Sequence, residues 1–228
     1  MIFRSIIFSF FLLSHFSSYS QLQDLYTFPK GVSDKYSFNS AEEYKTSSKI
    51  KVRGATLIDI KNYAELVSYG KANLFKSGNI YMDWGEMEDY LNNILNKELP
   101  DSLKNKNCKI YLVRDPYYNA FAYHDGSFFV NIGLLADVYN EAGLAIIIGH
   151  EISHYLNNDV QKLYFEKLKS FSKKNRNDTE LRIQNAHSSQ TQEQKADSIS
   201  FILSQKAGYD IKYGLNNFYH FLISEVIN

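Results

Sequence analysis

One segment of the sequence, residues 140–157, constrains the fold more than any other. It reads NEAGLAIIIGHEISHYLN, in which Asn140 is a good N-terminal cap and Glu141 falls in the first turn of a helix. Residues 144–148 are apolar on every side, and a helix of that kind lies in the interior of a protein. The sequence therefore predicts a buried helix that ends at or just after Asn157.

Three polar side chains interrupt this apolar helix. His150 and His154 are four residues apart, so both imidazoles project from one face about one turn apart, as two ligands of one zinc ion require. Glu151 can then reach a water at the metal without being a ligand itself. An H-E-x-x-H sequence would arise by chance in roughly 1% of shuffled chains of this composition. The pattern predicts one Zn²⁺ per chain, with Glu151 as the catalytic residue.

The composition limits how such a metal can be held. The chain has 228 residues, 44% of them hydrophobic, and one cysteine, Cys108. These values exclude a disordered chain, an internal disulfide and a cysteine-rich metal site. Because 25 Lys and Arg balance 25 Asp and Glu, no net field draws the chain to nucleic acid or to an anionic membrane. We expect histidine and carboxylate ligands and no nucleic-acid partner.

The third ligand is not in the same segment. The zinc-protease pattern H-x-x-G-x-x-H is excluded, because the chain has Asn157 and Val160 where that pattern needs glycine and histidine. A second helix is predicted over residues 191–208, since apolar residues recur there at helical spacing and a glycine follows. A carboxylate from this later helix could complete the site.

Glu193 and Asp197 are the carboxylates of that helix, and they share one face. Glu193 could ligate the metal while Asp197 accepts a hydrogen bond from the outer nitrogen of a ligating histidine. The two residues could equally form a solvated, acidic helix start. Glu180 and His187 are alternative ligands, so the residues alone leave this choice open.

The rest of the chain predicts an α+β fold that is mainly helical with a small antiparallel sheet. Apolar periodicity predicts helices, β-rich runs predict strands, and an Asp-Gly pair predicts a hairpin between the last two strands. The predicted helices cover residues 57–75 and 84–99, and the predicted strands cover residues 109–114, 119–123 and 127–131. No linker divides the chain, so residues 56–228 are expected to form a single domain after a polar lead-in over residues 21–55.

Residues 1–20 have the order of a secretory signal peptide. Arg4 precedes an apolar stretch, residues 6–16, and a small polar run ends at Ser20. The apolar stretch is shorter than the roughly 20 residues of a spanning helix, which makes a retained anchor the weaker interpretation. We expect cleavage after Ser20 and export to a periplasmic or extracellular compartment, with no integral membrane span after cleavage.

Several motifs in the same order make the chain similar to the M48 family of zinc metallopeptidases, in particular to its HtpX- and BepA-like members. The resemblance covers roughly residues 91–210, with NAFA at 119–122, FVNIGLL at 129–135, HEISH at 150–154, EQKAD at 193–197 and AGYD at 207–210. It implies a zincin-like fold of gluzincin type, with Glu193 as the third ligand and Asp197 beside a ligating histidine. It also implies that a strand formed by Asn119, Ala120, Phe121 and Ala122 lies along the active-site cleft and binds substrate.

The chain departs from the family pattern close to the metal ligands. Members often have a basic residue and a histidine shortly after the second ligand, where this chain has Asn158 and Asp159. The residue that stabilises the transition-state oxyanion is left open. His187 and His220 are the candidates.

These features predict a zinc metalloendopeptidase that cuts extended or unfolded polypeptides among exported proteins, in quality control or processing. Zinc and Glu151 would activate the attacking water. The alternative is a non-catalytic or chaperone-like binding module that keeps the zinc for structure, with Cys108 or His187 as a fourth ligand.

Overall fold

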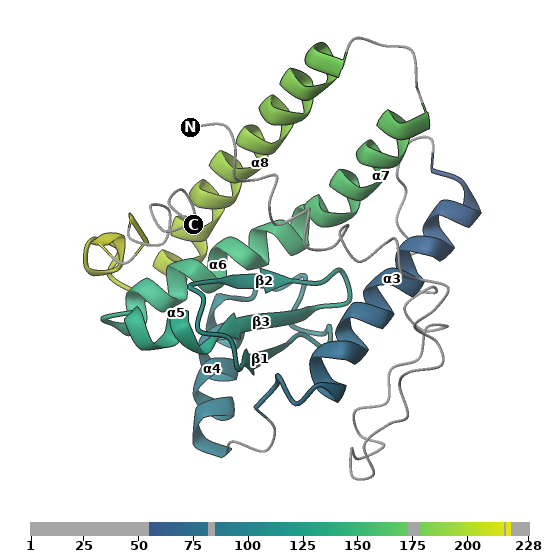
Figure 1. The fold of residues 1–228 in the computed structure, drawn as a ribbon. Coiled ribbons are helices and arrows are strands. Elements are labelled where there is room, and N and C mark those ends of the chain that lie inside the picture. Colours follow the sequence, from purple (N-terminus) through teal and green to yellow (C-terminus); the bar gives the residue numbers. More distant parts are fainter. Residues whose placement is uncertain (1–54, 82–84, 173–177, 217, 220–228) are drawn as a thin grey trace.

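The computed structural model has an α+β fold in which helices surround a small sheet (Figure 1). It describes residues 55–81, 85–172, 178–216 and 218–219, and their side chains apart from those of Tyr69, Lys76 and residues 166–189. The elements are α3 (Leu57–Lys76), α4 (Gly85–Glu98), β1 (Lys109–Val113), β2 (Ala120–Ala122), β3 (Ser127–Asn131), α5 (Ile132–Asp137), α6 (Glu141–Asn157), α7 (Asp159–Ser172) and α8 (Asp178–Lys206). The predicted fold class is confirmed. The predicted signal peptide and nearly all of the polar lead-in lie outside the described residues.

The three strands form a mixed sheet in the order β1-β3-β2. The predicted hairpin is confirmed: β2 and β3 are antiparallel, with Phe121 opposite Phe129, and Gly126 in the turn has a φ of 88° that favours glycine. β1, however, runs parallel to β3, so the prediction of a purely antiparallel sheet is wrong in this respect. Residues 114–119 carry the chain past the place of β3, and β3 then returns between the other two strands.

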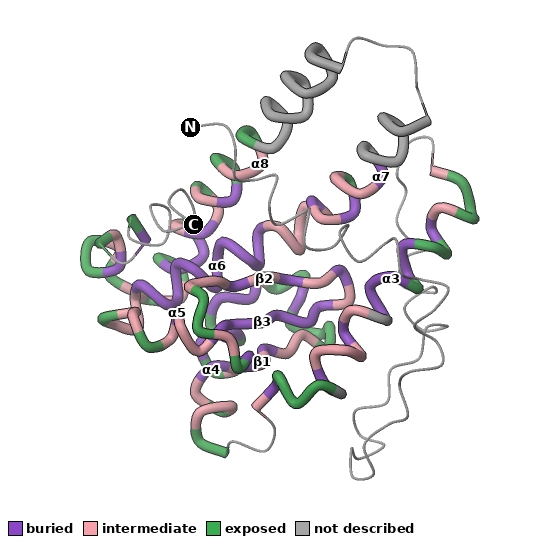
Figure 2. The backbone as a smooth tube through the Cα atoms, viewed as in Figure 1, coloured by how far each residue is buried: buried purple, intermediate pink, exposed green. Residues whose placement is uncertain are grey.

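One face of the sheet packs against α4, α6 and α8 in an aliphatic core. Ala120 and Ala122 of β2 point into this core, together with Ile110 and Leu112 of β1. The central strand β3 is buried along its whole length, as its position between two strands requires. Burial in the tube view is densest along β3 and the first half of α6 (Figure 2). This core fixes α6 against the sheet.

The other face of the sheet is aromatic and faces α3. Phe75 of α3 meets the ring of Tyr111 edge-on at a centroid distance of 5.0 Å, and Phe121 stacks on Phe129 at 4.9 Å. Such pairs add to the free energy of burial because ring edges and faces carry opposite partial charges. The sheet therefore lies between α3 on one side and the α4, α6 and α8 group on the other.

Helices α6, α7 and α8 follow each other in sequence; α6 lies just above the sheet in Figure 1, and α7 and α8 extend from there toward the top of the view. The prediction of a helix over residues 140–157 is confirmed to within one residue, and Ile146, Ile147 and Ile152 within it are fully buried. α6 packs most extensively against α8. Within the described part of the chain, no helix combines the length and the apolar character needed to cross a membrane.

Candidate metal centre

Helix α6 positions the two histidines and the catalytic carboxylate that the sequence singles out. Asn140 caps the start of the helix, where its Oδ1 accepts a hydrogen bond from the amide of Gly143 at 2.8 Å. His150 and His154 lie on one face of α6 with their Nε2 atoms 2.9 Å apart. His150 is buried and His154 is half-buried, so the pair sits at the point where α6 begins to emerge from the core.

Glu193 of α8 meets this pair of imidazoles. Its Oε2 lies 3.3 Å from Nε2 of His150 and 3.7 Å from Nε2 of His154. Among the described residues, these three are the group of histidine and carboxylate side chains whose ligand atoms converge closely enough to hold a metal ion. Glu193 reaches the pair because α8 packs along α6.

Two further carboxylates fix the orientation of the imidazoles. Asp197 Oδ1 lies 3.0 Å from Nδ1 of His150, and Asp159 Oδ2 lies 3.1 Å from Nδ1 of His154. An ionised carboxylate only accepts hydrogen bonds, so Nδ1 is the donor in both rings. In the neutral ring this leaves the lone pair on Nε2, which is the atom that faces Glu193.

The three ligand atoms fit a tetrahedral zinc ion. Zinc bonds to nitrogen and oxygen of about 2.0–2.1 Å imply about 3.4 Å between neighbouring ligand atoms. The three separations here, 2.9, 3.3 and 3.7 Å, lie on both sides of that value. Two lone pairs and a carboxylate oxygen that converge in this way repel one another unless a cation lies between them.

The electrostatics of the site also favour positive charge. Burial lowers the pKa of His150 and of His154, but hydrogen bonds to carboxylates outweigh burial and raise the two values to about 9 and about 11. Burial raises the pKa of the Glu193 carboxyl, but the two imidazoles outweigh it and hold that pKa well below its ordinary value. The carboxylates of Glu193, Asp197 and Asp159 therefore stabilise positive charge at the two imidazoles.

Glu151 lies between the three candidate metal ligands and the sheet. It is 8% exposed, and burial raises the pKa of its carboxyl, while the two imidazoles and the backbone amide of Ala122 act in the opposite direction. The contact with Ala122 links the carboxylate to strand β2. A carboxyl group with a raised pKa, beside a metal site and a strand edge, is suited to accept and release a proton.

Strand β2 is an edge strand of the described sheet and lies beside α6. Asn119 and Tyr123 make the backbone hydrogen bonds to β3: Asn119 O accepts from Asn131 at 3.0 Å, and the Tyr123 amide donates to Ser127 at 2.7 Å. Because the direction of backbone groups alternates along a strand, those of Ala120 and Ala122 point away from β3. The four residues that the resemblance assigns to substrate binding therefore lie at the edge strand of the described sheet.

Asp159 is a site residue that reasoning from the sequence did not select. Its side chain is 7% exposed and it is the first residue of α7. The sequence contained a signal, since a carboxylate follows the second histidine by five residues. Its use depends on the corner between α6 and α7, where Asn158 adopts a left-handed conformation with φ of 55°.

Glu98 is a second residue that the sequence did not mark. It is 2% exposed, and neither carboxyl oxygen has a hydrogen-bond partner among the described residues. Burial raises its pKa to about 8; the hydroxyl of Ser204 is near enough to lower that pKa but makes no well-aligned hydrogen bond. The carboxyl lies against Gly149, where an added Cβ would be 2.6 Å from Oε2.

Other candidates from the sequence do not join the ligand group in the described part of the chain. Cys108 lies against Gly126 in the hairpin turn. Glu180 and His187 lie on α8, but their side chains are outside the described residues, and His220 is outside them altogether. The choice of the oxyanion-stabilising residue stays a prediction.

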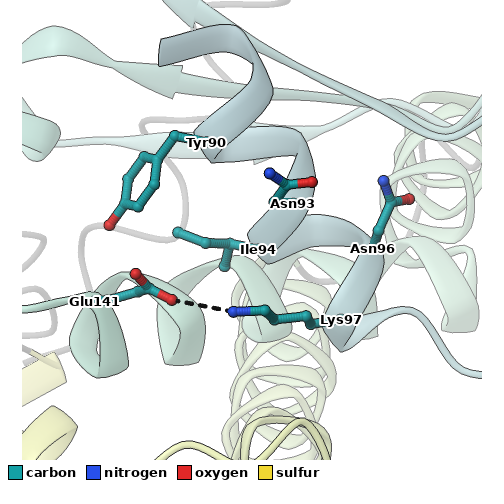
Figure 3. A pocket seen from close by; sticks show the side chains of 6 residues that line it. All are labelled: Tyr90, Asn93, Ile94, Asn96, Lys97 and Glu141. Carbon is teal, nitrogen blue, oxygen red and sulfur yellow. Dashed lines mark hydrogen bonds and ion pairs between the residues drawn. The ribbon is translucent and has the colours of Figure 1, made fainter. Parts of the chain in front are cut away.

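A hollow in the described surface lies away from the three convergent side chains. Tyr90, Asn93, Ile94, Asn96 and Lys97 of α4 line it together with Glu141, and it has a volume of about 440 Å³ (Figure 3). Lys97 and Glu141 form an ion pair of 3.4 Å across it. Glu141 precedes His150 by nine residues, or about 14 Å along a helix, so this hollow is separate from the metal centre.

No curated protein matches the chain. The model of peptidase family M48 matches residues 88–173, from the first turn of α4 to just past the end of α7. The match includes the two histidines and Glu151, and it ends before α8, so it does not cover Glu193 and Asp197, which the geometry brings to the site. It does not distinguish the HtpX- and BepA-like branch, which stays a prediction. The segment that carries the H-E-x-x-H helix is therefore similar to peptidase family M48.

Proposed function

We propose that this protein is a zinc-dependent metalloendopeptidase that hydrolyses peptide bonds of exported proteins, in quality control or processing. The observation that carries the proposal is the convergence of His150, His154 and Glu193, with Glu151 beside them. The chemistry of this donor set fits one zinc ion and leaves a fourth tetrahedral position for water or substrate.

Zinc held by the three ligands would supply Lewis acidity toward the substrate carbonyl and the attacking water. Glu151 would accept a proton from that water as the water oxygen bonds to the carbonyl carbon. The same carboxyl would then give the proton to the amide nitrogen as the carbon–nitrogen bond breaks, so Glu151 ends each cycle ionised. Burial of Glu151 supports this role, because it raises the pKa of the carboxyl above its ordinary value.

The edge strand supports extended polypeptide as the substrate class. A peptide that pairs with the outward backbone groups of Ala120 and with the carbonyl of Ala122 would be held by its own backbone, with little demand on its sequence. Only unfolded or flexible segments can adopt that conformation at the edge. The export of the protein and of its substrates rests on the signal-like order of residues 1–20.

Glu151→Gln tests the proposal most directly. The variant should retain zinc, because residue 151 is not a ligand, and should lose about 10²- to 10⁴-fold in the cleavage of unfolded casein. Glu86→Gln on the exposed surface of α4 is the matched control and should cut casein as wild type does. Metal analysis of each purified protein, and cleavage with and without a chelator, complete the experiment.

The outcomes separate the two functional classes. Equal cleavage by Glu151→Gln and wild type would exclude Glu151 as the general base. A wild-type protein that contains zinc and cuts no extended substrate would favour the non-catalytic binding module.

A further inference from the structure

We propose that Asp159 is a positioning residue for the second zinc ligand, and that α3 controls the metal site by fixing the helix that carries Asp159. The inference rests on the proposed zinc site. It goes beyond the ligands themselves, because it assigns a role in metal binding to a helix that lies outside the family-matched residues 88–173.

The turn between α6 and α7 places the side chain of Asp159 beside the ring of His154. α6 ends at Asn157, and Asn158 turns the chain with φ of 55° and ψ of 38°. α7 then starts at Asp159, whose Oδ2 lies 3.1 Å from Nδ1 of His154. Asp159 Oδ1 lies 3.5 Å from Nζ of Lys162, so both carboxyl oxygens have a partner. A carboxylate held in this way fixes the ring orientation of His154 and raises its basicity as a ligand.

The two imidazoles depend on different helices for this support. Asp197, which holds His150, is on α8 together with the third ligand Glu193. Asp159, which holds His154, is on α7. The position of His154 in the metal centre therefore depends on where α7 lies.

Aromatic packing on α3 fixes α7. Phe165 of α7 is 3% exposed and is buried in a cluster with Ile60, Tyr63 and Val67 of α3. The ring of Tyr63 lies 5.7 Å from that of Phe165 and 5.0 Å from that of Tyr164. Figure 1 shows α3 beside α7 on the side of the molecule away from α8. The chain of contacts thus runs from α3 through Phe165 to α7, and from Asp159 to the metal ligand.

Zinc affinity of Asp159 variants tests the first step. Competition with a chromophoric chelator should show that Asp159→Ala raises the zinc dissociation constant about 10- to 100-fold. Asp159→Asn should have a smaller effect in the same direction, because its amide oxygen still accepts the hydrogen bond but carries no charge. Asp101→Asn, at a side chain that is 94% exposed, is the matched control and should bind zinc as wild type does.

A spectroscopic measurement gives a readout that a purely structural role of Asp159 would not change. In the zinc-loaded protein, proton NMR should show downfield signals from the two carboxylate-bound imidazole N–H groups, and Asp159→Ala should lose one of them. If Asp159→Ala does not fold, Asp159→Asn carries the test. Wild-type affinity in both variants would overturn the inference and leave the proposed function standing. A wild-type chain that binds no zinc would overturn the proposed function itself.

A pair of core substitutions tests the second step. Phe165→Leu loosens α7 on α3 and should weaken zinc binding about threefold to tenfold, less than loss of the carboxylate itself. Phe75→Leu is the matched control, because it removes a ring from the same α3 helix where that helix faces the sheet. Both should lower the free energy of unfolding by a similar amount, but only Phe165→Leu should alter zinc affinity. Equal zinc affinities of the two variants would contradict the role of α3.

Discussion

Helix α6 contacts buried polar groups at two neighbouring places. Only at one of them do these groups have hydrogen-bonding partners among the described residues. At His150 and His154, carboxylates from α7 and α8 hold the outer ring nitrogens, and Glu193 faces the inner ones. One residue earlier, at Gly149, α6 meets the carboxyl of Glu98, for which the described residues offer no hydrogen-bond partner. The polar groups at both places are largely buried, so the two places differ mainly in whether the described residues supply partners for those groups.

The comparison shows what marks a functional site in this fold. Burial raises the pKa of both Glu98 and Glu151. Of the two, only Glu151 also faces two imidazoles and an edge strand of the described sheet. A raised pKa therefore identifies a buried carboxyl, and the convergence of other reactive groups on it identifies the site.

Among the substitutions that test this comparison, removal of the proposed third ligand, Glu193, should have the largest effect. Glu193→Ala leaves His150 and His154 as the described ligands, so we expect loss of bound zinc and a fall in cleavage of about 10³-fold or more. Metal analysis and casein cleavage measure the two effects. Gln194→Ala, at an exposed position of the same helix, is the control. Full zinc content in Glu193→Ala would transfer the role of third ligand to another residue.

The buried carboxyl of Glu98 should make the free energy of unfolding depend on pH. The folded-state pKa of Glu98, about 8, lies above its ordinary value of 4.5, so its proton favours the folded state. The contribution is complete below pH 4.5 and is lost as pH rises to about 8, at about 1.4 kcal/mol per pH unit. Between pH 5 and 8, the free energy of unfolding of wild type should therefore fall by up to about 4 kcal/mol relative to Glu98→Gln. Urea titrations of both proteins without metal measure this, and parallel pH profiles would show that Glu98 is not protonated in the fold.

Filling the space beside Glu98 should give the next largest effect. Gly149→Ala adds a Cβ 2.6 Å from Glu98 Oε2 and 3.3 Å from the backbone of Ser200. We expect a loss of about 1–3 kcal/mol in the free energy of unfolding, the cost of overpacking a core. Glu98→Ala in the same chain should recover part of it, and a double-mutant cycle measures the coupling. Strictly additive effects would mean that the two residues do not compete for space.

A surface contact near the metal centre should have the smallest effect. Lys195 Nζ donates a hydrogen bond of 2.6 Å to Oδ1 of Asn157, which joins α8 to the end of α6. Because Lys195 is exposed, Lys195→Met should cost less than about 1 kcal/mol in stability. Its zinc dissociation constant, measured with the same chelator, should stay within about threefold of wild type. A tenfold loss would add Lys195 to the groups that hold the metal centre together.

The parts of the fold that follow local rules could be predicted from the sequence. α6 begins at a capping asparagine and continues through an apolar run, and the hairpin follows an Asp-Gly pair. The parallel pairing of β1 with β3 has no local signal, because it depends on how residues 114–119 cross the sheet. Three short strands joined by short segments favoured a purely antiparallel sheet, whereas the strands form a mixed sheet in the order β1-β3-β2.

In the candidate site, too, some features follow from the local sequence and others depend on the tertiary structure. The spacing of His150 and His154 sets their shared face, since both are on one helix. The pairing of Asp159 with His154 depends on a left-handed residue at the corner, and asparagine adopts that conformation often but not always. Glu98 could have been found, because it continues the stripe of Leu91, Ile94 and Leu95 on α4, and all four side chains are buried.

Helix α8 carries both Glu193 and Asp197, and this has a thermodynamic consequence. If α8 separates from α6, the proposed zinc site loses Glu193 and His150 loses its carboxylate partner in the same step. Zinc binding and the docking of α8 are then linked equilibria, so each must favour the other by the same free energy. A molecule that draws α8 away would release the metal, and a saturating zinc concentration would oppose that molecule.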